Sequence, residues 1–173
     1  PPGTAKTSII NCLSKAIDLP LAQLSIGGAK DSSYLTGHSY TYEGSTPGAI
    51  VQALYTLGYK NGMIYFDEFD KISKTNHGME LSRILLHITD FSQNNKFHDR
   101  YISNNLDIDL SNIWFIYSLN DVNLLDKTLC DRIPIIEVEG YNDKEKYQIA
   151  KNHLIPKALQ NINISKELVS FAE

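Results

Sequence analysis

The first residues of the chain, PPGTAKTS, form a motif suited to holding phosphate groups. They match the pattern G-x-x-x-x-G-K-S/T from its second position onward. In such a loop, backbone N–H groups at the start of a helix surround phosphate oxygens, the lysine reaches the outer phosphates and the hydroxyl binds magnesium. The alternative is an ordinary proline–glycine turn before a helix. The candidate residues for binding ATP with Mg2+ are Pro2, Gly3, Thr4, Ala5, Lys6, Thr7 and Ser8.

Ala5 is the departure from this pattern, because it stands where the second glycine is expected. A residue with a β-carbon in the left-handed backbone conformation costs about 1–2 kcal/mol. A loop can tolerate that cost, so Ala5 weakens the match without removing it. The motif with Ala5 predicts nucleotide binding but does not predict how tight the binding is.

The second motif is acidic and ends the apolar run MIYFDEFD. At the end of a buried parallel strand, Asp67 is placed to hold magnesium together with Thr7, and Glu68 is placed to activate an attacking water. Taken alone, the four residues DEFD are equally typical of a solvated acidic turn. Their occurrence after the phosphate-loop motif favours the catalytic interpretation.

The elements that must position these residues are strands and helices in alternation. Short runs rich in β-branched and aromatic residues predict strands at 21–26, 63–67, 112–118 and 133–138. The segments around these strands have apolar residues at helical spacing, which predicts helices at 7–17, 47–57, 79–88 and 143–159. This alternation predicts an α/β fold with a parallel sheet covered by helices. Pro47 is expected in a first helical turn, and the polar stretch 92–111 is expected to be a loop or an irregular hairpin.

Composition limits the classes of protein to which the chain can belong. With 173 residues, of which 42% are hydrophobic, it is long enough for one compact domain with a core. A net charge of -4 argues against a broad basic surface for nucleic acid. The two cysteines have no C-x-x-C spacing, and no apolar run has the length of about 18 residues that a membrane span needs. We expect an intracellular protein, cytoplasmic or in an organelle matrix, without a membrane or nucleic-acid partner.

The segment LSIGGAKDSSYLTGHSYTYEGSTPGAIVQAL resembles a pattern of the Lon-type ATP-dependent proteases. The segments QNNKFHDRY, DLSNIWFI, DRIPIIEVEGY and EKYQIAKNHLIPK continue the match, so the resemblance covers essentially the whole chain. In that light the two motifs above are the Walker A and Walker B motifs of an AAA+ ATPase. The chain departs from the Lon pattern by about two extra residues between Tyr101 and Asp109, by Glu43, and by Ser39 and Tyr40 in place of a basic pair. A different substrate preference is therefore expected.

The resemblance implies a P-loop NTPase fold with strand order 5-1-4-3-2, in which strand 1 precedes Pro1 and is missing from this sequence. It implies a large α/β nucleotide-binding subdomain at 1–140 and the beginning of a helical lid at 141–173.

The resemblance also assigns roles to three further residues. Asn120 matches the sensor residue that positions water beside the catalytic glutamate, although an asparagine after a strand is often a turn residue. Arg132 matches the arginine finger that acts on a neighbouring subunit, and the alternative is a surface arginine paired with Asp131. Tyr42 matches the pore-loop tyrosine that grips the substrate, and the alternative is an ordinary strand residue.

Together these features predict ATP hydrolysis that drives unfolding and translocation of polypeptide. The resemblance implies a homo-oligomer, a hexameric ring, that acts on unfolded or tagged proteins. A Ser–Lys peptidase would lie outside these residues. Two alternatives are a protease-less AAA+ remodelling factor and a scaffold that binds nucleotide without hydrolysing it.

Overall fold

The structure is a computed structural model that describes residues 2–27, 29, 31–41, 43–72 and 76–163. The chain divides into two compact units. The first unit holds residues 5–137, and the second holds residues 2–4 and the chain from Val138 onward. Tyr42 lies outside the described residues.

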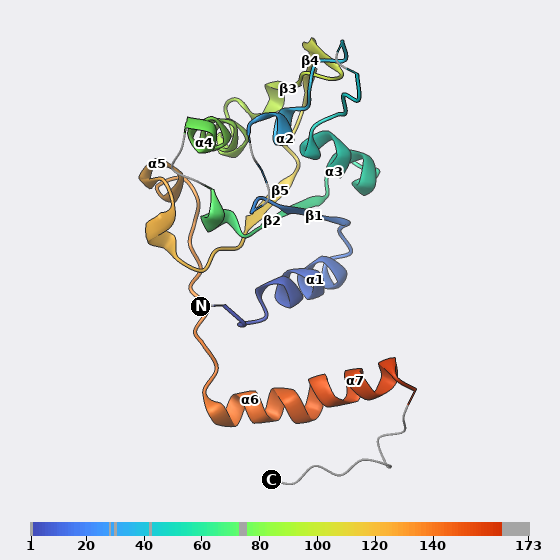
Figure 1. Ribbon diagram of the computed structural model, residues 1–173, viewed down its shortest axis with the longest axis vertical. Coiled ribbons are helices and arrows are strands. Elements are labelled where there is room, and N and C mark those ends of the chain that lie inside the picture. Colours follow the sequence, from blue (N-terminus) through green and yellow to red (C-terminus); the bar gives the residue numbers. More distant parts are fainter. Residues whose placement is uncertain (1, 28, 30, 42, 73–75, 164–173) are drawn as a thin grey trace. The chain divides into compact units, whose positions relative to one another are not determined.

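A parallel sheet of three strands forms the centre of the first unit (Figure 1). Its order is β1 (Leu21–Ser25), β2 (Met63–Asp67) and β5 (Trp114–Tyr117). Leu21 is opposite Met63, which is in turn opposite Trp114. The predicted α/β fold with a parallel sheet is confirmed. Strands β5, β2 and β1 correspond to strands 4, 3 and 2 of the predicted order, and they are neighbours in that sequence.

Burial follows from the central position of β2. Its residues Met63, Ile64, Tyr65 and Phe66 are fully buried, since β2 has a neighbour on each side and is covered on both faces. Buried apolar residues of two helices, α3 (Ala49–Leu57) and α4 (Asn76–Thr89), belong to the same core. A strand that is apolar on both faces is typical of a covered parallel sheet.

The other helical elements of the first unit are short, apart from α1 (Lys6–Ala16). They are α2 (Ser33–Thr36), η1 (Phe69–Lys71), η2 (Asn94–Lys96), η3 (Val122–Leu124) and α5 (Lys127–Cys130). The prediction that Pro47 lies in a first helical turn is wrong, because α3 begins at Ala49 with Gly48 as its N-cap. Gly48 is extended, at φ -67° and ψ 160°, and its N–H donates to the buried carboxylate of Asp99.

The polar stretch after α4 contains an antiparallel hairpin of β3 (Phe97–Asp99) and β4 (Ser103–Ile108). Its pairing is irregular between Phe97 and Asp99. The hairpin alternative of the prediction is therefore confirmed. Phe97 is buried in the core cluster, which attaches the hairpin to the body of the unit.

The predicted strand at 133–138 is wrong for this chain, because these residues form no strand. In the predicted order this segment pairs only with strand 1, and none of the strands in the described part of the chain takes that place in the sheet. Ile136 is accordingly 87% exposed.

The second unit contains α6 (Asp143–Ile149), a π-helical turn η4 (Ala150–Leu154) and α7 (Ile155–Asn161). Asn142 and Glu145 form a reciprocal capping box at the start of α6. Pro156 lies in the first turn of α7 and has no backbone N–H, which is consistent with the wider turn before it. Within the described part of the chain, no helix is long and apolar enough to cross a membrane.

Candidate functional site

The phosphate-loop residues are divided between the start of α1 and the short segment before it. Ala5 is the N-cap of α1 and has the left-handed conformation, at φ 57° and ψ 25°, as the motif predicts for a glycine position. Its carbonyl accepts the first helical hydrogen bond, from the N–H of Ile9 at 2.9 Å. Lys6 and Thr7 therefore lie in the first turn, where backbone N–H groups are available to an anion. Ser8 lies in the same turn and is exposed.

Pro2, Gly3 and Thr4 belong to the second unit. Gly3 has a positive φ of 74°, which glycine adopts without strain. Thr4 is buried, and its carbonyl accepts a hydrogen bond from the Tyr141 hydroxyl at 3.4 Å.

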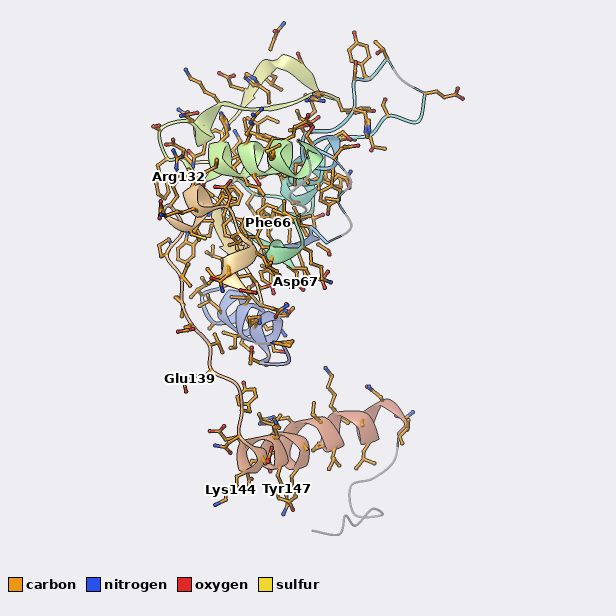
Figure 2. The ribbon with its side chains drawn as sticks, turned by 60° about the vertical axis from the view of Figure 1, so that its left-hand side comes forward. Phe66, Asp67, Arg132, Glu139, Lys144 and Tyr147 are labelled. Atoms are coloured by element: carbon orange, nitrogen blue, oxygen red, sulfur yellow. The ribbon has the colours of Figure 1, made fainter. Side chains whose placement is uncertain are left out.

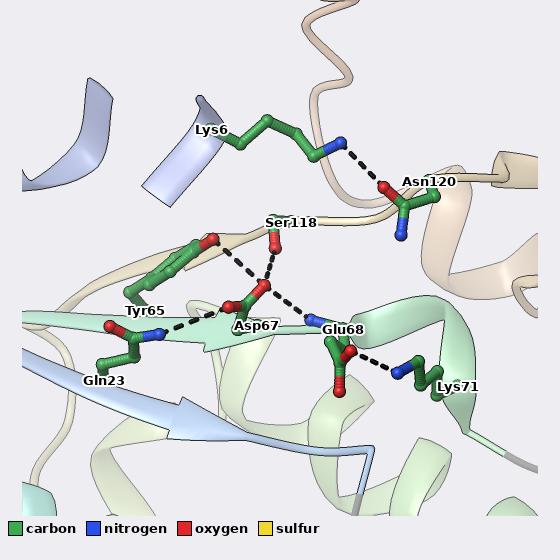
Figure 3. Close-up of polar contacts among 8 residues, drawn as sticks. All are labelled: Lys6, Gln23, Tyr65, Asp67, Glu68, Lys71, Ser118 and Asn120. Atoms are coloured by element: carbon green, nitrogen blue, oxygen red, sulfur yellow. Dashed lines mark hydrogen bonds and ion pairs between the residues drawn. The ribbon is translucent and has the colours of Figure 1, made fainter. Parts of the chain in front are cut away.

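Asp67 is the centre of a polar network at the carboxyl end of β2 (Figure 3). Its Oδ1 accepts hydrogen bonds from the Ser118 hydroxyl at 2.6 Å, the Tyr65 hydroxyl at 3.2 Å and the Glu68 N–H at 2.9 Å. Gln23 of β1 donates to Oδ2 at 3.3 Å. Tyr65 can reach Asp67 because residues two apart lie on the same face of a strand. These donors fix the orientation of the Asp67 carboxylate.

The Tyr65 hydroxyl also connects Asp67 to α1. It lies 3.2 Å from the Thr7 hydroxyl and 3.2 Å from the Asp67 carboxylate. Thr7 and Asp67, which are far apart in sequence, thus have one oxygen atom between them. A hydroxyl and a carboxylate so close together suit Mg2+, which prefers oxygen ligands and uses few of them from the protein. The described residues contain no group of three or more His, Cys, Asp or Glu placed to bind a metal ion.

Lys6 and Asn120 are in direct contact. The Lys6 ammonium donates a hydrogen bond of 2.9 Å to the side-chain oxygen of Asn120, across 114 positions of sequence. The contact joins the first turn of α1 to the loop that follows β5. The structure therefore brings the predicted phosphate-binding lysine and the predicted sensor residue to one place.

The backbone N–H of Glu68 belongs to this network, whereas its carboxylate is directed toward Lys71. The residue has the left-handed conformation, at φ 58° and ψ 41°, which is uncommon for glutamate and occurs often at functional sites. Its carboxylate forms an ion pair with Lys71 and points away from Lys6 and Asn120 in Figure 3. It lies so close to Gly27 that a β-carbon there would be 2.5 Å from Glu68 Oε2.

Arg132 lies apart from this network, well separated from Asp67 in Figure 2. Its Nη1 forms an ion pair with Asp90 at 3.0 Å and donates to the Leu86 carbonyl at 3.5 Å. The ion-pair partner of Arg132 is thus Asp90. The alternative interpretation of the sequence had named Asp131 as the partner. The pKa of Asp90 is lowered, chiefly because the Ser92 hydroxyl and N–H donate to its carboxylate, and further by Arg132.

The positioning roles of Tyr65, Gln23 and Ser118 were not predicted from the sequence. The alternation of MIYFD contains the signal for Tyr65, which occurs two residues before Asp67. Gln23 gives no such signal, because its contact depends on the register between β1 and β2.

Comparison with known proteins agrees with this geometry. Residues 1–141 match the family model described as "ATPase family associated with various cellular activities (AAA)". The chain is 39% identical over 173 residues to a Lon protease homolog of Acanthamoeba polyphaga mimivirus, with 100% of this chain and 17% of the relative covered. It is 37% identical over 173 residues to a Lon protease of Desulforamulus reducens, with 100% of this chain and 21% of the relative covered.

A third relative is a Lon protease of Campylobacter concisus, 41% identical over 174 residues, with 96% of this chain and 21% of the relative covered. The chain thus spans at most about a fifth of the length of these relatives. The matches confirm the predicted resemblance to Lon-type ATPase modules. The chain belongs to the AAA family of ATPases.

Proposed function

We propose that this module binds and hydrolyses ATP with Mg2+ at the cluster of Lys6, Thr7 and Asp67, and that hydrolysis drives unfolding and translocation of polypeptide. The observation that carries the proposal is the Tyr65 hydroxyl, which lies 3.2 Å from both the Thr7 hydroxyl and the Asp67 carboxylate. This hydroxyl links Thr7 and Asp67, and the contact of Lys6 with Asn120 adds the lysine to the same edge of the sheet, which supports a site for phosphoryl transfer there.

Each of these side chains has a distinct role in the proposal. The first turn of α1 and the Lys6 ammonium bind the phosphates of ATP, and Lys6 exchanges its contact with Asn120 for a phosphate oxygen. Thr7 and Asp67 hold Mg2+, which when bound neutralises charge on the phosphates. Asn120, released from Lys6, orients the attacking water through its neutral amide.

Glu68 is the proposed general base. Its carboxylate takes a proton from the attacking water. This role requires the carboxylate to leave Lys71, with which it forms an ion pair. A lysine three residues away on an exposed turn is a weak partner, since exposed ion pairs contribute about 0–1 kcal/mol. The pair with Lys71 is therefore easily exchanged.

The proposed assembly is a homo-oligomeric ring, in which Arg132 of one subunit acts on the nucleotide of the next. Arg132 lies away from Asp67 of its own chain, which supports action between subunits. The relatives that are named Lon proteases support a peptidase partner activity and protein substrates.

The test uses the full-length protein and its Glu68→Gln variant. The unmodified protein is expected to hydrolyse ATP in the presence of Mg2+ and to unfold a fluorescent reporter that carries an unstructured tail. Glu68→Gln is expected to bind ATP with similar affinity, because Asp67 is unchanged, and to lose hydrolysis and unfolding by about 100-fold or more. Asp107→Asn, a matched change of an exposed carboxylate on the hairpin, is the control. Hydrolysis by Glu68→Gln at the parent rate would contradict the assignment of Glu68. Reporter unfolding without ATP would contradict the proposed coupling.

A further inference from the structure

The carboxylate of Asp99, the last residue of β3, is completely buried. Its Oδ1 accepts hydrogen bonds from the N–H groups of Tyr101 at 2.9 Å and Ile102 at 3.2 Å. Its Oδ2 accepts one from the N–H of Gly48 at 2.8 Å, across 51 positions of sequence. In the described part of the chain the contacts of this carboxylate are with backbone amides, and no lysine or arginine pairs with it.

A local turn does not require this arrangement. Asp109 and Asp121 also accept a hydrogen bond from the backbone N–H two residues ahead, and both do so near the surface. Asp99 makes the same local bonds with one oxygen and uses the other for Gly48. A buried carboxylate carries a desolvation cost, which only well-formed hydrogen bonds offset. The contact with Gly48 is therefore the feature that distinguishes Asp99 from an ordinary turn residue.

Gly48 and Gly37 close the base of the loop at 38–47. The His38 N–H donates to the Thr46 carbonyl at 3.3 Å, which joins the two ends of the loop. A β-carbon on Gly37 would be 2.8 Å from the Gly48 nitrogen and 3.0 Å from Asp99 Oδ1. A β-carbon on Gly48 would be 2.1 Å from the Leu35 carbonyl oxygen. Side chains at these two positions would thus force the base apart.

The hairpin holds the other end of the loop as well. The N–H of Arg100, the residue after Asp99, donates to the Thr36 carbonyl at 2.7 Å. Thr36 precedes Gly37 at the start of the loop, and Gly48 follows its end. The β3–β4 hairpin is therefore bonded to both ends of the loop, and Figure 1 shows the two segments side by side.

We infer that Asp99 is a positioning residue for the loop at 38–47: it fixes the base of the loop to the β3–β4 hairpin, so that the loop moves with the body of the module. The inference rests on the proposed function and on the role that the family resemblance implies for Tyr42, which is contact of this loop with the polypeptide substrate. A loop with a fixed base transmits displacement of the module to the substrate, whereas a loop with a loose base dissipates it by local motion.

The test is Asp99→Asn in the full-length protein. An asparagine side chain has one oxygen acceptor, and its other terminal group is an NH2 donor. This NH2 group must face the N–H of Gly48 or the N–H groups of Tyr101 and Ile102, and a donor cannot accept a hydrogen bond from them. Backbone amides of residues 38–46 and of Gly48 are expected to exchange hydrogen at least about tenfold faster, the scale of losing a hydrogen bond to a charged group. Unfolding of the tailed reporter is expected to slow by about tenfold, while basal ATP hydrolysis stays within about twofold of the parent. Asp107→Asn on the same hairpin, whose exposed carboxylate pairs with His98, should change none of the three.

Each other outcome overturns the inference. Unchanged exchange at 38–48 would mean that Asp99 does not fix the loop, and unchanged unfolding would mean that fixing it has no consequence for substrate. Equal loss of hydrolysis and unfolding would make Asp99 a packing residue. If Asp99→Asn fails to fold, exchange of the unmodified protein decides: the Gly48 amide should open together with those of Tyr101 and Ile102, and rapid independent exchange would contradict the tether. If the unmodified protein hydrolyses ATP without unfolding the reporter, the proposed function fails, while the exchange result still reports on the tether.

Discussion

Arg132 is bound to Asp90 at the C-terminal end of α4, with its Nη1 3.0 Å from Asp90 Oδ2. The same nitrogen lies 3.5 Å from the carbonyl of Leu86 in the last turn of the helix. A cation at this end of a helix is stabilised by the helix dipole as well as by the carboxylate. The Arg132 side chain is nevertheless 43% exposed, and a guanidinium has five N–H donors. Arg132 is thus oriented by its own chain and still able to contact another one.

The first prediction is that Arg132 acts on a neighbouring subunit. Arg132→Ala in the full-length protein should lower kcat for ATP hydrolysis by about 1,000-fold, the lower end for an arginine finger. Mixing Arg132→Ala subunits with Glu68→Gln subunits should restore part of the activity, because an intact Glu68 then meets an intact Arg132 across an interface. Arg83→Ala, at an exposed position of α4, is the control. Absence of any recovery in mixed oligomers would argue against action between subunits.

The second prediction concerns the pH dependence of the Asp90–Arg132 pair. Folding lowers the pKa of Asp90 from its ordinary value of 3.8, chiefly through the two bonds from Ser92. A lowered pKa means that the folded state favours the charged form, so the stabilisation is present above pH 3.8 and is lost as the pH falls through the lowered value. Asp90→Asn should therefore lower the Tm at pH 7. The difference in Tm between variant and parent should shrink as the pH falls below the lowered pKa. A difference in Tm that is independent of pH would contradict this account.

Residues that act within one element were predictable from the sequence, and residues that depend on contacts between elements were not. The strand at 63–67 and the acidic residues at its end follow from a local pattern of burial and period. The partner of Arg132 is Asp90, 42 positions earlier, and no local period indicates it. Likewise the segment predicted as a strand at 133–138 has the right composition, yet strand formation depends on a neighbouring strand, and none pairs with it among the described residues.

Glu68 illustrates the same limit at the site itself. Its position after β2 was predictable, because the strand pattern ends at Asp67. The direction of its carboxylate depends on Lys71 and on the space that Gly27 leaves. Neither the ion pair nor that space follows from the motif alone.

The third prediction tests the strain at Ala5. Its φ of 57° carries a cost of about 1–2 kcal/mol for a residue with a β-carbon. Ala5→Gly removes this cost and adds about 0.5–1 kcal/mol of lost chain entropy on folding. The free energy of unfolding should therefore rise by up to about 1.5 kcal/mol, measured as an increase in Tm. Ala16→Gly, at the last residue of the same helix, should lower it by about 0.5–1 kcal/mol. Equal signs for the two changes would show that Ala5 carries no strain.

The fourth prediction concerns Tyr42, whose proposed role is to grip the polypeptide. Tyr42→Ala in the full-length protein should slow unfolding of the tailed reporter far more than it slows ATP hydrolysis. In the proposed function, phosphate chemistry depends on Lys6, Asp67 and Glu68, whereas an aromatic side chain on a substrate loop supplies only apolar contact. Loss of that side chain removes about 1.5–3 kcal/mol of contact for each group gripped, estimated from burial of a large apolar side chain.

The control for this prediction is Tyr40→Ala, which removes a neighbouring tyrosine that is 71% exposed. If any tyrosine of the segment supplies the grip, the two variants should be equally impaired. If Tyr42 is the gripping residue, Tyr40→Ala should retain most of the unfolding rate. Glu43 sharpens the comparison, because a charged residue beside Tyr42 contributes little apolar contact of its own. Equal loss of hydrolysis and unfolding in Tyr42→Ala would assign Tyr42 to the packing of the module, since a residue that only contacts substrate has no reason to affect hydrolysis in the absence of substrate.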